Sequence, residues 1–339
     1  MQKTRLGRTD LMVTRSSFGA LPIQRISFDD AKKILLKAYN SGINFYDTAR
    51  MYTDSEEKLG YAFSDIRKDI IIATKSVATD KKTLLEHLET SLRNLKTDYV
   101  DILQLHNPDV LPDPDDPESS YAGLMEAKKK GIVRFAGITN HRIKTAVEAV
   151  ESGLYDTMQF PLNSLSSDMD LEIIGLCRKK DVGLIAMKAM SGGLITNAAS
   201  TFAFLRQFDN VVPIWGIQRE TELDEFLELE NNPPVLNDEL WEVIKRDRTE
   251  LAGNFCRGCG YCMPCPAEIE IPTQARISLL LRRAPYEQYL SDEFKEKMEL
   301  INKCIECGSC KNHCPYGIDT PNLLKAQLQD YNEFYATHK

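Results

Sequence analysis

Residues 69–106 contain three consecutive segments that decide the fold. Residues 69–75 read DIIIATK, residues 82–95 read KTLLEHLETSLRNL, and residues 99–106 read YVDILQLH. The first and third segments are short and almost continuously apolar, which is typical of strands covered on both faces of a sheet. The middle segment carries apolar residues at spacings of three and four, which predicts a helix. Since the connection is short, the two strands are expected to be parallel and joined by a right-handed crossover.

The same pattern repeats along the first two thirds of the chain. Further strands are expected near 16–22 and at 43–47, 133–139, 155–160, 183–188 and 211–217. Eight strand–helix pairs within about 230 residues predict an α/β fold, a (β/α)8 TIM barrel. An open doubly wound sheet is the alternative, but a dinucleotide-binding sheet of that kind calls for a G-x-G-x-x-G turn, which the sequence lacks. The opening TRLGRTDLMVTR (4–15) predicts a hairpin that closes the bottom of the barrel.

Composition excludes several classes of protein. The 339 residues include 42 Lys and Arg against 50 Asp and Glu, a net charge of −8, and 42% of them are hydrophobic. The charge argues against nucleic-acid or anionic-membrane partners, and the apolar content argues against a disordered chain. The chain has no apolar run of about 18 residues and no apolar signal-peptide core at its start. Together with the charge, this means that neither a membrane nor a nucleic-acid partner is expected. The expected location is cytoplasmic.

A second domain is expected after residue 235. The turn-rich NNPPVLND (231–238) separates a barrel at 1–235 from a domain at 236–339, where helices are predicted at 238–251, 273–283, 291–303 and 321–335. Eight of the nine cysteines lie in this all-helical domain, whose core would be thin without a metal. The ninth, Cys177, lies on an apolar helix face and is expected to be a buried, inert thiol.

Four ionisable residues lie at or just after the ends of successive predicted strands: Asp47, Tyr52, Lys75 and His106. The carboxyl ends of barrel strands meet on one face, where active sites form. A free phenol has a pKa of about 10, which a neighbouring lysine cation would lower. Asp47 would hold Lys75 by a charge-assisted hydrogen bond, and His106 would orient a carbonyl or help transfer its proton. The four side chains together suit reduction of a carbonyl group.

These residues identify a family resemblance over residues 1–230. Asp47-Thr-Ala-x-x-Tyr52, the strand-terminal Lys75 and the Leu-His106 pair resemble the aldo-keto reductases, which implies an enzyme that uses NADPH or NADH to reduce a small carbonyl substrate. The resemblance also implies a set of cofactor-binding residues: Thr139, Asn140, Gln159, Met190, Ser191, Gly192, Gly216, Gln218, Arg219 and Glu222. Ordinary loop capping is the alternative for the first three, and a solvated helix start is the alternative for Arg219 and Glu222.

One position departs from the family pattern. Glu222 stands where many members carry an arginine for the 2′-phosphate of the cofactor, and Arg219 is the only cation nearby. A carboxylate would repel that phosphate and could accept a hydrogen bond from a ribose hydroxyl. This favours NADH, or the use of both dinucleotides.

Two cysteine motifs predict iron–sulfur clusters. Residues 256–266 read CRGCGYCMPCP and residues 304–315 read CIECGSCKNHCP, and the second is a bacterial ferredoxin signature. In such motifs the fourth cysteine ligates the other cluster, which predicts two [4Fe–4S] clusters. The predicted ligands are Cys256, Cys259, Cys262 and Cys314 for one, and Cys304, Cys307, Cys310 and Cys265 for the other. All-thiolate zinc sites are the alternative.

Helical segments between the motifs resemble an all-helical dicluster ferredoxin-like domain, and the fused architecture resembles a subgroup of aldo-keto reductases with a C-terminal ferredoxin-type domain. Hydride transfer moves two electrons at once, whereas a cluster moves one, so direct exchange between the dinucleotide and a cluster is not expected. The clusters could instead exchange electrons with an external carrier such as a ferredoxin or flavoprotein. They could also be structural, or sense redox state. A carbonyl reductase is the first hypothesis. An electron-transfer or redox-sensing protein on a barrel without carbonyl reductase activity is the second.

Overall fold

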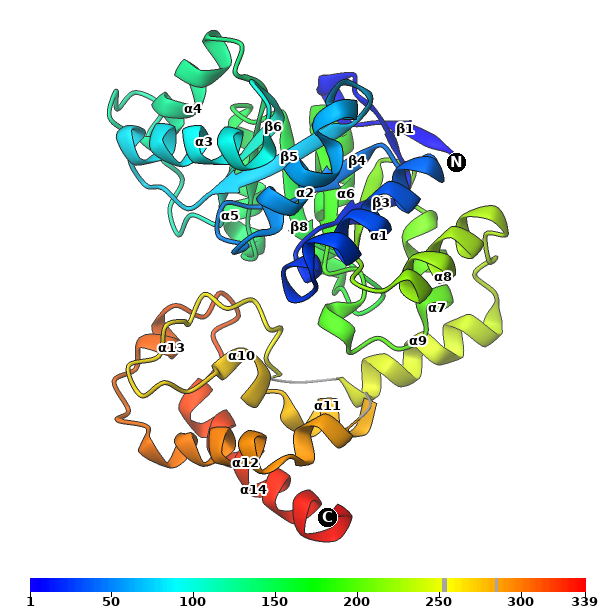
Figure 1. The fold of residues 1–339 in the computed structure, drawn as a ribbon, viewed down its shortest axis with the longest axis vertical. Helices are drawn as coiled ribbons and strands as arrows, with labels where there is room; N and C mark the ends of the chain where they lie inside the picture. The colour runs from blue at the N-terminus through cyan, green and yellow to red at the C-terminus, as the bar shows by residue number, and fades with distance from the viewer. Residues whose placement is uncertain (252–254, 284–285) are drawn as a thin grey trace. The chain divides into compact units, whose positions relative to one another are not determined.

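The chain folds into two compact units in a computed structural model that describes residues 1–251, 255–283 and 286–339 (Figure 1). The first unit comprises Met1–Ala189 and Ala198–Trp241, and the second comprises Met190–Asn197 and Glu242–Lys339. The boundary predicted after residue 235 falls shortly before this division. The segment Met190–Asn197, which the sequence places in the barrel, groups with the C-terminal unit.

Eight parallel strands close a barrel in the first unit, in the order β10-β3-β4-β5-β6-β7-β8-β9. Every predicted strand is present, and closure of the sheet excludes the doubly wound alternative. The strands are β3 (Ser17–Gly19), β4 (Phe45–Asp47), β5 (Ile71–Ser76), β6 (Val100–His106), β7 (Val133–Thr139), β8 (Thr157–Pro161), β9 (Gly183–Met187) and β10 (Val211–Gly216). β6 is buried along its whole length, as its continuously apolar sequence predicts.

A helix follows each strand and packs on the outside of the barrel. These helices are α1 (Phe28–Asn40), α2 (Ser55–Phe63), α3 (Lys81–Leu95), α4 (Ser120–Lys129), α5 (Ile143–Ser152), α6 (Asp168–Lys180), α7 (Ala198–Arg206) and α8 (Glu220–Asn231), with α9 (Asp238–Glu250) after them. Local signals fix their ends: the side chains of Ser27 and Asp80 cap α1 and α3 at their N-termini. Within the described residues, no helix is long and apolar enough to span a membrane.

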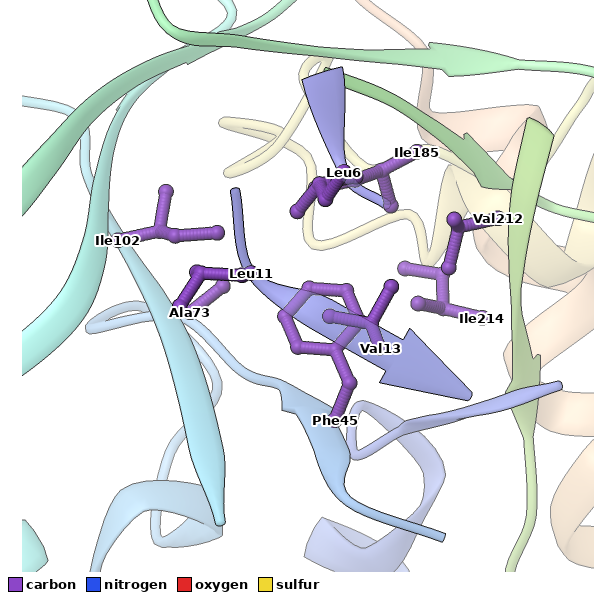
Figure 2. Close-up of a cluster of buried hydrophobic side chains, with 9 residues drawn as sticks. All are labelled: Leu6, Leu11, Val13, Phe45, Ala73, Ile102, Ile185, Val212 and Ile214. Carbon is purple, nitrogen blue, oxygen red and sulfur yellow. The ribbon is translucent and has the colours of Figure 1, made fainter. Parts of the chain in front are cut away.

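The N-terminal hairpin closes the amino end of the barrel, as its sequence predicts. β1 (Lys3–Arg5) pairs antiparallel with β2 (Met12–Thr14). Leu6, Leu11 and Val13 of the hairpin form one cluster with inward-facing side chains of five barrel strands (Figure 2). Those side chains are Phe45, Ala73, Ile102, Ile185, Val212 and Ile214. The amino half of the barrel is therefore a packed apolar core and not a channel.

Gly7 allows the hairpin to approach the barrel closely. Its φ is +50°, and a Cβ atom there would lie 2.1 Å from the backbone nitrogen of Gly183, the first residue of β9. No other residue type fits a left-handed backbone with so little space beside it.

The described residues of the C-terminal unit form helices and loops and contain no strand. After α9 it contains α10 (Ile271–Gln274), α11 (Ile277–Arg283), α12 (Asp292–Glu299), α13 (Ser309–Asn312) and α14 (Thr320–His338). The single helix predicted over 273–283 is divided by a turn at Ala275–Arg276. A small set of buried side chains forms the core, including Ile277, Met298, Leu324 and Tyr331. Cys177, in α6 of the barrel, is fully buried, and burial raises the pKa of its thiol to about 12, as expected for an inert cysteine.

The apolar plug yields a stability prediction. Leu6 is 1% exposed, whereas Met12 in the same hairpin is 50% exposed. Leu6→Ala should lower the free energy of unfolding by about 2–5 kcal/mol, because it leaves a cavity beneath the barrel. Met12→Ala should change it by less than about 0.5 kcal/mol. Urea denaturation followed by circular dichroism measures both, and equal effects of the two substitutions would contradict the plug.

Candidate functional site

A buried ion pair lies at the carboxyl ends of β4 and β5. Lys75 Nζ donates to Asp47 Oδ1 at 2.5 Å and to the Thr48 carbonyl oxygen at 2.6 Å. Lys75 and Asp47 are 1% and 2% exposed. The last residue of β4 and the next-to-last of β5 both point into the barrel, so the closure of the sheet brings the two charges together.

Two amides also contact the carboxylate. Gln104 Nε2 donates to Asp47 Oδ2 at 3.1 Å, and Gln159 Nε2 donates to Asp47 Oδ1 at 3.4 Å. Burial raises the pKa of Asp47, while Lys75 and the two amides lower it. Burial lowers the pKa of Lys75, while Asp47 raises it. Since both carboxylate oxygens accept hydrogen bonds from donors, the arrangement favours the ionised pair.

Tyr52 lies beside this ion pair and beside His106. Lys75 Nζ is 5.3 Å from the centroid of the Tyr52 ring, and the rings of Tyr52 and His106 meet edge to face at 6.0 Å. The loop that carries Tyr52 is held in place at both ends, because the hydroxyls of Thr48 and Ser55 are 2.9 Å apart and Ser55 Oγ donates to the Ala20 carbonyl oxygen. The structure thus brings together the four residues predicted from the sequence.

The acidity predicted for Tyr52 is not found. The sequence predicts that Lys75 lowers the pKa of the phenol, but burial and the negative charge of Asp47 raise that pKa well above 10. Lys75 donates its hydrogen bonds to Asp47 and to the Thr48 carbonyl. The negative charge of Asp47 therefore largely cancels the effect of the Lys75 ammonium on the pKa of Tyr52. Tyr52 is therefore a neutral phenol at physiological pH.

His106 ends β6 and is buried. Burial first, and the Lys75 cation second, lower its pKa from 6.5 to about 3. The imidazole is therefore neutral at physiological pH and has one N–H donor and one nitrogen acceptor. This fits the predicted role of orienting a carbonyl better than the role of supplying a proton.

The first three predicted cofactor residues lie on β7 and β8 and just after β7. Thr139 Oγ1 accepts a hydrogen bond from the Asn107 backbone nitrogen, and Asn140 Nδ2 donates to the Pro108 carbonyl at 2.8 Å. Both side chains therefore cap loops, as the alternative interpretation predicts, although each retains further hydrogen-bonding capacity. Gln159 Oε1 accepts from Gln104, and its amide is buried in the barrel.

The residues predicted for the adenosine side of the cofactor differ in their surroundings. Glu222 Oε2 accepts from the backbone nitrogens of Gln218 at 2.9 Å and Arg219 at 3.1 Å, and Glu222 pairs with the Arg219 guanidinium. The carboxylate that suggested a ribose contact is therefore engaged in capping α8. Gly216 is exposed at the end of β10.

The predicted pyrophosphate loop groups with the C-terminal unit. Met190, Ser191 and Gly192 lie in the segment Met190–Asn197. The Gly192 carbonyl accepts a hydrogen bond from Arg276 Nη1 at 3.0 Å within this unit. Gly192 has a φ of +67°, and a Cβ atom there would meet the same guanidinium at 2.9 Å.

Sequence analysis missed two buried polar residues of the site. Gln104 lies two residues before His106 on β6, so the strand periodicity of two places it on the same inward face. Glu56 is 1% exposed and accepts a hydrogen bond from Thr74 Oγ1 at 2.7 Å. Thr74 directly precedes Lys75 in the chain. The other oxygen of Glu56 accepts from Arg50 and Asn94. Nothing in the run Ser55–Lys58 distinguishes this glutamate from a solvent-exposed one.

The two cysteine motifs fold alike. In both, the residues flanking the second cysteine have positive φ: Gly258 and Gly260 in the first, Glu306 and Gly308 in the second. Alternation of this kind turns backbone N–H groups toward one point, which favours an anionic centre such as a thiolate cluster. In the first motif the Gly258 nitrogen donates to Cys256 Sγ at 3.3 Å.

Cysteines of both motifs line one apolar cavity, which is partly open to solvent. Cys304, Cys307 and Cys310 reach it from the second motif, and Cys262 and Cys265 reach it from the first. Cys265 is the ligand that the sequence assigns to this second cluster. Ile269, Ile271 and Leu324 supply the apolar wall that iron–sulfur clusters require to be shielded from water.

The residues present fit a cluster better than a single ion. In the ranges 1–251, 255–283 and 286–339, no three Cys, His, Asp or Glu side chains are arranged to hold one metal ion. A zinc site would draw four sulfur atoms to within about 2.3 Å of one point. The five thiols comprise the four cysteines that the sequence assigns to the second cluster, together with Cys262, which the sequence assigns to the first.

The neutral state of His106 can be tested by pH titration. Its pKa is lowered from 6.5 to about 3, so the unfolded chain binds a proton that the folded chain does not. Stability from this residue is therefore complete above about pH 6.5 and is lost as the pH falls toward 3. NMR titration of histidine-labelled protein, with His106→Gln to assign the signal, should show a neutral imidazole at pH 5. A signal that titrates between pH 6 and 7, as in the urea-unfolded chain, would contradict this.

Comparisons with known proteins agree with the two-unit architecture. Residues 16–242 match the aldo/keto reductase family, and residues 255–319 match the 4Fe-4S dicluster domain. The second match favours iron–sulfur clusters over zinc. The chain is 30% identical over 212 residues to the uncharacterized oxidoreductase YqkF of Bacillus subtilis, covering 58% of this chain and 67% of that protein. It is 29% identical over 210 residues to L-galactose dehydrogenase of Arabidopsis thaliana, covering 56% and 66%.

The match thus spans about two thirds of the length of each of these relatives. Among solved structures, the aldo-keto reductase of Klebsiella pneumoniae in complex with NADPH superimposes with a TM-score of 0.63 at 18% identity, covering 72% of this chain and 94% of that one. At that identity the likeness establishes the fold of the barrel. Because the family match extends over most of the chain, this protein belongs to the aldo/keto reductase family and carries a C-terminal 4Fe-4S dicluster domain.

Proposed function

We propose that the protein reduces an aldehyde or ketone to an alcohol with NADH or NADPH, with Tyr52 as the proton donor. One observation carries this proposal: the buried Lys75–Asp47 pair lies directly beside the neutral phenol of Tyr52 and the neutral imidazole of His106. Ion pairs that are fully buried cost free energy, and at the mouth of a barrel such a cost is typically associated with catalysis.

Each residue has a separate role in the reaction. The dinucleotide supplies a hydride to the carbonyl carbon, and Tyr52 supplies the proton that the oxygen needs, so that aldehyde or ketone becomes alcohol. His106, with its lowered pKa, donates a hydrogen bond to the carbonyl oxygen as a neutral group and orients it. The ammonium of Lys75 stabilises the phenolate that Tyr52 leaves behind, and Asp47 holds that ammonium in place.

The residues at the carboxyl ends of β7 and β8 suit the nicotinamide end of the dinucleotide. Gln159 is buried and its Nε2 makes only the long 3.4 Å contact to Asp47, which leaves a second N–H for a carboxamide. Thr139 and Asn140 retain acceptor and donor capacity beyond their loop contacts. We assign the adenosine side to Gly216–Glu222, which lies in the same unit as the barrel strands. Glu222 caps α8, so its carboxylate is already engaged and gives no separate reason to prefer NADH. Both NADH and NADPH are therefore to be tested as cofactors.

Substitution of Tyr52 tests the reaction. Tyr52→Phe removes the donated proton and should reduce kcat by at least about a thousandfold for every carbonyl on a panel of aldehydes and ketones. The affinity for NADPH or NADH, measured by fluorescence titration, should change less than about threefold. Tyr61→Phe is the matched control, because Tyr61 is a partly exposed residue of α2 whose hydroxyl contacts Asp29. Turnover that survives Tyr52→Phe would refute the role of the phenol.

A second function is favoured by a different observation. Five cysteines of the two motifs line one pocket, and one of them, Cys307, is exposed. An electron-transfer or redox-sensing protein that exchanges electrons with an external ferredoxin or flavoprotein would use such a site. It would show reducible clusters and no NAD(P)H oxidation with any carbonyl. The intact Tyr52 site favours the first function.

We also propose that the C-terminal unit binds two [4Fe–4S] clusters with crossed ligands. Anaerobically purified protein should contain about eight irons and absorb in the visible region. Cys265→Ser should lower the iron content by about half and remove one of two electron paramagnetic resonance signals after reduction, because Cys265 lines the cavity of the second motif.

Cys177→Ala is the control for the cluster assignment, since this buried cysteine lies in α6 of the barrel. It should leave iron content and spectra unchanged. Zinc in place of iron in the anaerobic protein would refute both clusters. An unchanged iron content in Cys265→Ser would refute the crossed ligation.

A further inference from the structure

Gln104 lies between two functional groups of the barrel. Its Nε2 donates to Asp47 Oδ2 at 3.1 Å and to Gln159 Oε1 at 2.9 Å. All three side chains are buried, and they come from three different strands, β4, β6 and β8. A single amide nitrogen therefore joins the carboxylate of the ion pair to the glutamine assigned to the nicotinamide.

The charge on Asp47 fixes the orientation of both amides. If Gln104 were turned by 180°, its carbonyl oxygen would face the Asp47 carboxylate and the Gln159 carbonyl, and both contacts would be repulsive. With Gln104 fixed, turning Gln159 would place its amino group against the amino group of Gln104 and its oxygen against Asp47. Only one polarity of Gln159 therefore satisfies the network, with its Nε2 toward Asp47 Oδ1.

Packing leaves Gln104 little freedom to move away. Gln104, Gly137 and Thr157 lie side by side on β6, β7 and β8. A Cβ atom at Gly137 would lie 2.5 Å from Thr157 Oγ1 and 2.8 Å from Gln104 Cγ, so the glycine provides the space that the glutamine occupies. Within the described residues, Gln104 Oε1 and Thr157 Oγ1 have no hydrogen-bond partner. In the described parts of the chain, the side-chain amide of Gln104 thus makes its two hydrogen bonds through its nitrogen and none through its oxygen.

We propose that Gln104 is a positioning residue that couples the Asp47–Lys75 ion pair to Gln159, so that the charge on Asp47 sets which end of the Gln159 amide faces the nicotinamide carboxamide. This inference rests on the proposed function, because it requires a dinucleotide at Gln159. Gln104 acts through its neighbours and does not itself touch the reacting atoms.

Cofactor affinity provides a readout that is separate from turnover. Gln104→Met preserves the length of the side chain and removes its donor, and it should weaken NADPH and NADH binding roughly tenfold in a fluorescence titration. Thr157→Val is the matched control in the same row, because it removes a buried hydroxyl that has no partner among the described residues. It should leave affinity and turnover within about twofold of the wild type.

A double-mutant cycle tests the coupling itself. Asp47→Asn removes the charge that orients the amides, so it should also weaken cofactor binding roughly tenfold. Combined with Gln104→Met, the loss should stay near tenfold and not reach a hundredfold, because both changes break one network. Additive losses, or an affinity of Gln104→Met within twofold of the wild type, would overturn the proposal.

Gln104→Glu provides a second variant in case the methionine variant does not fold. At neutral pH its carboxylate would face Asp47 and repel it, whereas at lower pH a protonated carboxyl group can donate one hydrogen bond. Asp47, Lys75 and His106 are the titratable groups facing it, and the wild type controls for their own pH dependence. Cofactor affinity of this variant relative to the wild type should rise several-fold from pH 8 to pH 5. A flat ratio would count against the proposal.

Failure of the proposed function is distinguishable from failure of this inference. If the wild type binds NADPH but reduces no carbonyl, the reductase assignment fails and the affinity ratios still decide the role of Gln104. If the wild type binds neither dinucleotide, both fail.

Discussion

The barrel is organised around the cost of burying an ion pair. Removing a carboxylate and an ammonium from water costs several kcal/mol per ion, which good geometry must offset. Here Lys75 donates to Asp47 and to a backbone carbonyl, and the second oxygen of Asp47 accepts from Gln104. The interior is accordingly divided. Its amino half is an apolar core sealed by the hairpin (Figure 2), and its carboxyl half holds the polar side chains of Asp47, Lys75 and Gln104. The apolar half offers no polar partner from below, so neighbouring side chains and the Thr48 carbonyl satisfy these charges.

The ion pair also determines the states of its neighbours. Because Asp47 compensates Lys75, little positive charge remains to acidify Tyr52, and burial keeps the phenol neutral. The same burial keeps His106 neutral. The site therefore holds two neutral hydrogen-bond donors, Tyr52 and His106, beside the Asp47–Lys75 ion pair. In the proposed reaction, the ammonium of Lys75 stabilises the phenolate that forms next to it when Tyr52 donates its proton.

The sequence predicts the fold well because each barrel strand is covered on both faces and is therefore almost continuously apolar. The same feature makes polar strand ends conspicuous, which is why Asp47, Lys75 and His106 could be found. Gln104 was missed because it lies inside an apolar run, where one polar residue resembles an exposed position. The role of Glu222 could not be fixed from the sequence, because a capping carboxylate and a ribose-binding carboxylate occupy the same place at the start of α8. Electrostatic effects could not be predicted either, since the pKa of Tyr52 depends on burial that only the structure provides.

The C-terminal unit depends on a different constraint. Its buried apolar residues are few, and its two cysteine loops have matching backbone turns that direct N–H groups toward one point. Cys265 follows the first loop in the chain but lines the cavity of the second. In the proposed crossed ligation, neither loop completes its donor set alone, and each cluster draws on a residue held by the other loop. Because the apolar core of this unit is thin, the free energy of cluster binding at the thiolates contributes directly to its folding. The clusters and the helices around them are therefore expected to assemble as one cooperative structure.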